Sequence, residues 1–161
     1  MSTPRTWREQ YDRMKRWLAR LAEGESVDER RVDDFYAFFT CCFHLKDWLK
    51  ADATLEPAVG ADAEGLFHPS RGLRWLQVCA DLANGSKHLV INRNVRVDPA
   101  TRLEKLSAAF DPGGFDPNAF QTRDTLVVYA DGGAWDALGL ADQCAMLWDT
   151  FLRNWDLLGD C

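Results

Sequence analysis

The feature that most constrains the fold of this chain is a stretch without any charged side chain, FYAFFTCCF at positions 35–43. Ser26 and Glu29 have the spacing of a capping box and predict a helix that runs from there to about residue 50. Successive side chains of a helix point about 100° apart, so this stretch carries apolar groups on every side. A helix that is apolar all round is normally enclosed by others. The stretch predicts the central helix of a bundle, or a helix covered further by a partner chain.

Three further segments each carry a single apolar stripe, as expected for helices packed around that centre. The first begins at Thr3-Pro4, a cap and a first helical position, and ends near Gly24. Another is capped by Ser70 and continues at least to Ala83, and the last spans about residues 138–158. Their inward positions are Trp7, Tyr11, Met14, Leu18 and Leu21; Leu73, Leu76, Cys79 and Leu82; and Cys144, Trp148, Phe151, Trp155 and Leu158.

The segments between the helices are rich in turn-forming residues. Residues 51–69 hold two Pro and two Gly and predict a linker with one short helical turn. The alternation of residues 89–97 favours a strand. Residues 99–123 are expected to be irregular, with one helical turn near Leu103–Ala109. A β-hairpin is predicted over residues 125–138.

The predicted fold class is therefore mainly all-α. We expect a four-to-five-helix bundle that forms a single domain over residues 1–161, with a small β-hairpin or sheet insertion at about 89–137, before the last helix. The formal net charge of −6 gives the molecule no long-range attraction for nucleic acid or anionic membranes. Any binding of phosphates must come from a local patch.

The five cysteines, Cys41, Cys42, Cys79, Cys144 and Cys161, include no C-x-x-C pair and leave one without a partner. This pattern favours reduced, buried thiols in a cytosolic protein over disulfides or a metal site. The sequence starts without a signal-peptide pattern and contains no apolar run of about 18 residues. We expect a cytoplasmic location and no membrane partner.

Two groups of polar side chains interrupt the apolar helical patterns. His44 and Asp47 are one turn apart in the central helix. Asp81, Asn84 and His88 fall within roughly 60° of one another if their helix is continuous. Polar groups in apolar helices cost free energy unless they are partnered or used. If the two helices pack side by side, these groups meet in one pocket, where carboxylates would raise the pKa of the imidazoles and suit them to acid–base chemistry.

Basic side chains lie next to this predicted pocket. Lys87 precedes His88, and Arg93 and Arg96 follow it, so a small cationic patch suited to a phosphate is predicted on an acidic protein. Structural interpretations remain open beside the functional one. The polar groups would then bond to the backbone or tie helix ends together, and the basic residues would form a solvated strand face.

The sequence NGSKH near the end of a bundle helix resembles the motif of the HEPN superfamily (higher eukaryotes and prokaryotes nucleotide-binding domains). That motif is an arginine, usually followed by a polar residue such as Asn, and a histidine a few residues later. Asn84 and His88 match the polar residue and the histidine, and Ala83 stands in place of the arginine. The resemblance covers mainly residues 26–90.

The resemblance implies a helical, often dimeric protein of a bacterial toxin–antitoxin or phage-defence type that binds or cleaves RNA. Cleavage would be metal-free and use no cofactor, with His88 as acid or base and Asn84 orienting the backbone. Lys87 or a neighbouring arginine would offset phosphate charge, and Arg71 or Arg74 could stand in for the missing arginine. A homodimer is expected, with the aromatic central helix as a candidate dimer face.

Two other functions remain open. A non-catalytic module that binds a partner protein or a nucleotide fits the absence of the motif arginine. A metal site would use His44, Asp47, Asp81 and His88. Hydrolases with a G-x-S-x-G nucleophile, P-loop ATPases and nicotinamide enzymes are unlikely classes, because the sequence contains none of their motifs.

Overall fold

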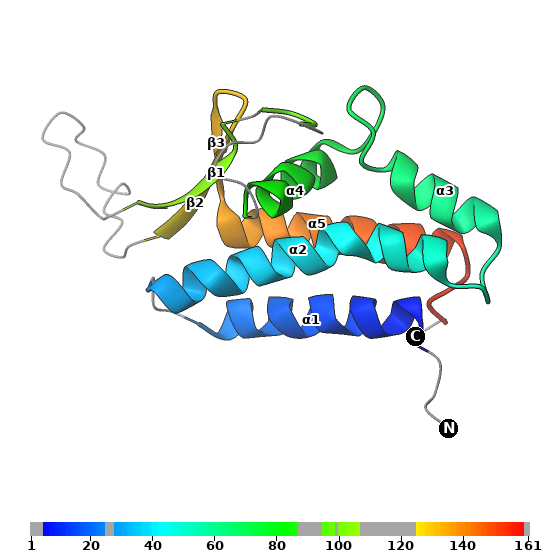
Figure 1. Ribbon diagram of the computed structural model, residues 1–161. Helices are drawn as coiled ribbons and strands as arrows, with labels where there is room; N and C mark the ends of the chain where they lie inside the picture. Colours follow the sequence, from blue (N-terminus) through cyan, green and yellow to red (C-terminus); the bar gives the residue numbers. More distant parts are fainter. Residues whose placement is uncertain (1–4, 25–27, 87–94, 99, 107–124, 160–161) are drawn as a thin grey trace, which may run out of the picture.

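The computed structural model describes residues 5–24, 28–86, 95–98, 100–106 and 125–159. Five helices and a three-stranded antiparallel sheet occupy these ranges (Figure 1). The helices are α1 (Trp7–Glu23), α2 (Glu29–Ala51), α3 (Pro57–Gly65), α4 (Arg74–Gly85) and α5 (Ala137–Asn154). The strands are β1 (Arg102–Leu106), β2 (Thr125–Ala130) and β3 (Gly133–Asp136), in the order β1-β2-β3. The mainly helical fold class with a small sheet before the last helix is confirmed.

Helix α2 is the centre of the bundle, as its uncharged stretch predicts. It contacts α1, α3, α4 and α5, and in Figure 1 it runs between α1 and α4. Three consecutive residues, Cys41, Cys42 and Phe43, are all buried, which is possible only for a helix covered on several sides. The rings of Phe35, Phe38 and Phe39 are also buried within the chain itself. These rings therefore need no partner chain to cover them.

Residues 51–69 contribute more to the core than a linker would. They contain α3, a helix of nine residues with Pro57 at its first turn, where the missing N–H of proline is harmless. Beyond α3, Phe67 is only 2% exposed. Its ring centroid lies 5.2 Å from that of Phe43 in α2 and 5.9 Å from that of Trp148 in α5. The prediction of a linker with one helical turn is wrong, because this segment fills the space between α2 and α5.

Three predicted helix starts differ from those observed. Helix α1 begins at Trp7 after Thr6, whereas a start at Thr3-Pro4 is predicted from the sequence. Helix α2 is capped by Asp28, whose carboxylate accepts a hydrogen bond from the Arg31 amide. Helix α4 begins at Arg74 after Leu73, whereas a start at Ser70 was predicted. Ser70 instead belongs to a turn in which its amide donates to Nδ1 of His68. The His68 side chain therefore stabilises a local turn at Ser70, and the helix starts at the residues that follow.

The β insertion also differs in part from the expectation. Strand β1 occupies Arg102–Leu106, where a helical turn was predicted, and pairs along its whole length with β2. The predicted hairpin is confirmed as β2 and β3, joined at Asp131 and Gly132, which both have positive φ. Residues 95–97 form no strand, and the rest of the strand predicted at 89–97 lies outside the described residues.

The hairpin ends where α5 begins, and Asp136 makes the transition. Its carboxylate accepts a hydrogen bond of 2.7 Å from the Gly139 amide. We expect Asp136→Ala to lower the free energy of unfolding by about 1 kcal/mol, because it removes this N-cap. Urea denaturation followed by circular dichroism measures the change. The exposed residue Asp142 of the same helix is the control, since Asp142→Ala removes a carboxylate but no cap. An equal loss in both variants would contradict the capping role.

Candidate functional site

Asp81 is the most tightly held of the polar residues singled out in the sequence. It lies in α4, is 0% exposed, and accepts backbone hydrogen bonds from three consecutive residues. The amide of Arg96 donates to Oδ1 at 2.8 Å, and those of Val97 and Asp98 donate to Oδ2 at 2.7 and 3.1 Å. A carboxylate that accepts several amide bonds is well satisfied in a buried position. Asp81 therefore holds the returning chain on α4.

A second carboxylate extends this connection to the sheet. Asp98 accepts hydrogen bonds from the amides of Ala100 at 2.8 Å and Asp131 at 2.7 Å. These two bonds lower the pKa of Asp98 below its ordinary value, because they stabilise the charged form. Asp131 is the positive-φ residue of the β2–β3 turn. Helix α4, residues 95–98 and the hairpin are thus joined in series by Asp81 and Asp98.

The segment that Asp81 holds brings a cation to α2. The guanidinium of Arg96 lies 5.5 Å from the ring centroid of Phe43, and Nζ of Lys46 lies 4.8 Å from the same ring. Cations within about 6 Å of a ring are attracted to its face. Lys46 also pairs with the carboxylate of Asp47 at 2.6 Å. One basic side chain of α2 and one of residues 95–98 therefore lie close to the same buried phenylalanine.

The residues predicted to meet between α2 and α4 are held in different ways. His44 is half-buried, with its ring 5.8 Å from that of Phe43. The carboxylate of Asp47 is 54% exposed and pairs with Lys46. Asn84 is half-buried in the last turn of α4, and its side-chain nitrogen is a buried donor without a partner among the described residues. Arg96 connects the polar residues of α4 with those of α2. Its amide is bonded to Asp81 in α4, and its guanidinium lies near Phe43, which precedes His44 in α2.

Three of the predicted site residues, Lys87, His88 and Arg93, lie outside the described residues. The chain on both sides of them is described. Ser86 caps the end of α4 and donates its hydroxyl to the Ala83 carbonyl at 2.7 Å, and residues 95–98 are bonded to Asp81 in the same helix. Both ends of the segment with these three residues are therefore fixed to the last turns of α4.

Ala83, which stands where the motif of the sequence comparison has its arginine, is part of the core. It is 1% exposed and carries no charge. Arg74 was predicted as a substitute but stands at the other end of α4, about 16 Å from Gly85 along the axis, where it pairs with Asp131. Arg71 precedes α4 altogether. Neither arginine therefore lies in the last turn of α4 within its own chain.

The metal site predicted from His44, Asp47, Asp81 and His88 has little support in the described residues. Both oxygens of Asp81 are used by backbone amides, and Asp47 is paired with Lys46. Among the residues the structure describes, only Cys42, Cys79 and Cys144 form a group of three or more candidate ligands.

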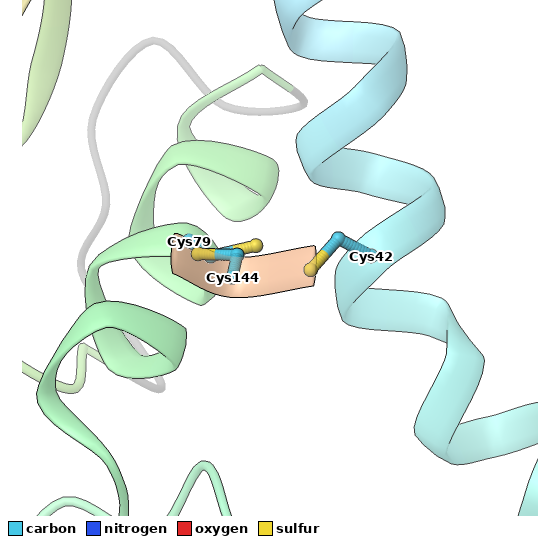
Figure 2. Close-up of side chains that lie close together, drawn as sticks. All are labelled: Cys42, Cys79 and Cys144. Atoms are coloured by element: carbon cyan, nitrogen blue, oxygen red, sulfur yellow. The ribbon is translucent and has the colours of Figure 1, made fainter. Parts of the chain in front are cut away.

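The sequence predicts that these three thiols are buried, but not that they meet. Each lies at the middle of its helix, in α2, α4 and α5 respectively, and their Sγ atoms lie within 4.8 Å of one another (Figure 2). Their apolar surroundings in the sequence indicate burial, whereas their meeting depends on how far the three helices are shifted along one another.

Comparisons with known protein families, with curated proteins and with solved structures found no match to this chain. No helix within the described ranges has the length and apolar character needed to cross a membrane.

Proposed function

We propose that this protein is a HEPN-like helical protein of the bacterial toxin or defence type, and that it binds RNA at the C-terminal end of α4. The observation that carries the proposal is the triple hydrogen bond at Asp81. It fixes the chain that follows Lys87, His88 and Arg93 to α4, and the chain that precedes them is the last turn of α4 itself. A binding segment fixed at both ends loses less conformational entropy when it engages a ligand.

The charges around this end of α4 suit a phosphate backbone. Arg96 and Lys46 lie over Phe43, and Lys87 and Arg93 are close to them in sequence. Such a local group of cations can attract phosphates on a protein whose net charge is −6. The buried amide nitrogen of Asn84 is a donor at the same end of the helix. His88 would contact the ribose or the phosphate and, if the site is active, transfer a proton without a metal.

We propose RNA binding as the main activity and RNA cleavage only as a second one. The motif arginine would stabilise charge in the transition state, and Ala83 cannot do so from the core. A non-catalytic module that binds a nucleotide or a partner protein is the second candidate, and the burial of Ala83 favours it over a nuclease. As in the proteins it resembles, we expect the module to act as a homodimer, which sedimentation analysis would detect.

We expect His88→Ala to weaken binding of single-stranded RNA at least tenfold, because the proposal gives His88 a contact with the ribose or the phosphate. Fluorescence anisotropy with a labelled RNA at low salt measures the affinity, and gel analysis of the same samples detects cleavage. The control is His68→Ala, which removes an exposed imidazole that only accepts a bond from the Ser70 amide. RNA binding or cleavage that survives in His88→Ala would remove the proposed role of His88. Absence of binding by the native protein would reject the proposal as a whole.

A further inference from the structure

Three cysteines meet in the core, where α2, α4 and α5 pack together. Cys42, Cys79 and Cys144 are each 0% exposed, and their Sγ atoms all lie within 4.8 Å of one another. Figure 2 shows the three sulfur atoms directed toward one another from three different helices. Buried thiols commonly serve as small apolar side chains. Three thiols that lie this close together can also act as the ligands of a metal ion.

The spacing of the sulfur atoms fits one metal ion. A metal–sulfur bond of about 2.3 Å places three trigonal sulfur ligands about 4 Å apart. That separation lies within the observed limit of 4.8 Å. Thiolate ligands select soft ions, of which copper(I) and zinc are the main candidates. Structural zinc takes four ligands, and the described residues offer no fourth beside the cluster.

The geometry points to a copper(I) site formed by Cys42, Cys79 and Cys144, and we propose that the protein binds one Cu⁺ there. Copper(I) would bond to the three sulfur atoms as thiolates, and the three thiol protons would leave to solvent, with no change of oxidation state. Because the ligands are fully buried, the ion enters as the chain folds. It would then join α2, α4 and α5 at the middle of the bundle. This proposal is independent of RNA binding at the end of α4.

The test is anaerobic refolding of the full chain with Cu⁺, followed by competition with a chromophoric copper(I) chelator. We expect one tightly bound copper per chain. The variants Cys42→Ala, Cys79→Ala and Cys144→Ala should each weaken binding at least tenfold. The matched control is the double variant Cys41→Ala/Cys161→Ala, which removes two thiols but none of the three ligands and should still bind one copper.

X-ray absorption of the native, copper-loaded protein supplies a measurement that needs no variant. Three sulfur neighbours at a single short distance would support the site even if a cysteine variant failed to fold. The proposal is overturned if the refolded native protein retains no stoichiometric copper, or if the absorption data show nitrogen or oxygen neighbours. Loss of copper from the Cys41→Ala/Cys161→Ala control, or preferential loading of zinc, would overturn it equally.

Discussion

Replacing Asp81 by alanine is expected to lower the free energy of unfolding by about 3–5 kcal/mol and to release residues 95–98 from α4. The variant leaves three backbone amides without the carboxylate that accepts their hydrogen bonds. A bond to a charged acceptor contributes about 1.5–3 kcal/mol, and the three bonds share one side chain, so their effects are not additive. Urea denaturation measures the loss, and hydrogen exchange at the amides of Arg96, Val97 and Asp98 locates it.

Two further variants test whether the loss of stability in Asp81→Ala comes from the lost hydrogen bonds. Asp81→Asn keeps the shape of the side chain but turns one acceptor into a donor, so we expect a smaller loss than for alanine. Asp47→Ala removes a carboxylate that is 54% exposed, and its pairing with Lys46 should contribute less than about 1 kcal/mol. If Asp81→Ala were as mild as Asp47→Ala, Asp81 would not be what holds residues 95–98.

The substitution Phe39→Asp should have the largest effect of those considered and leave the chain unfolded. The Phe39 ring is 0% exposed and lies 5.4 Å from the ring of Phe38, edge to face. Truncation of such a residue to alanine costs about 3–5 kcal/mol, and an unpaired buried carboxylate adds to that cost. The sum approaches the whole stability of a domain of this size. Circular dichroism and thermal denaturation measure the loss of structure.

Two control variants test whether the loss of structure comes from a buried charge at position 39. Phe39→Leu keeps the position apolar and should remain folded with a modest loss of stability. Met146→Asp places the same charge on a side chain that is 59% exposed in α5, and should change stability by less than about 0.5 kcal/mol. A folded, cooperative Phe39→Asp protein would contradict the burial of α2. Because Phe39 is covered within the chain, the prediction does not depend on a dimer.

The sequence allowed the bundle to be predicted because its signals are local. The uncharged stretch of α2 and the stripe of α1 depend only on spacing along one helix, and both are confirmed. Phe67 could not be placed in the same way. It follows a Gly- and Pro-containing helix, and its burial depends on the distant residues Phe43 and Trp148. Strand β1 was likewise missed because its structure depends on pairing with β2, some 20 residues later.

The candidate site was located but only partly interpreted. Asp81 stood out as a polar residue in an apolar pattern, and it is buried and fully engaged. Its partners are backbone amides, and because every residue other than proline has an amide, the sequence does not reveal which residues donate to Asp81. This explains why a structural role looked the same as a catalytic one. The convergence of three cysteines was hidden for a related reason, since helix pattern gives the face of each residue but not its height along the bundle.

The central position of α2 also has a consequence for synthesis of the chain. Helix α2 ends at Ala51, whereas Trp148, which donates a hydrogen bond to the Cys42 carbonyl, comes about 100 residues later. At about 5–20 residues per second, the ribosome needs roughly 5–20 s to make that distance. During that time the newly made helix can be covered by α1, and then by α3 and α4 as they emerge, but not by α5. Its phenylalanines are then a natural target for chaperones that hold nascent chains.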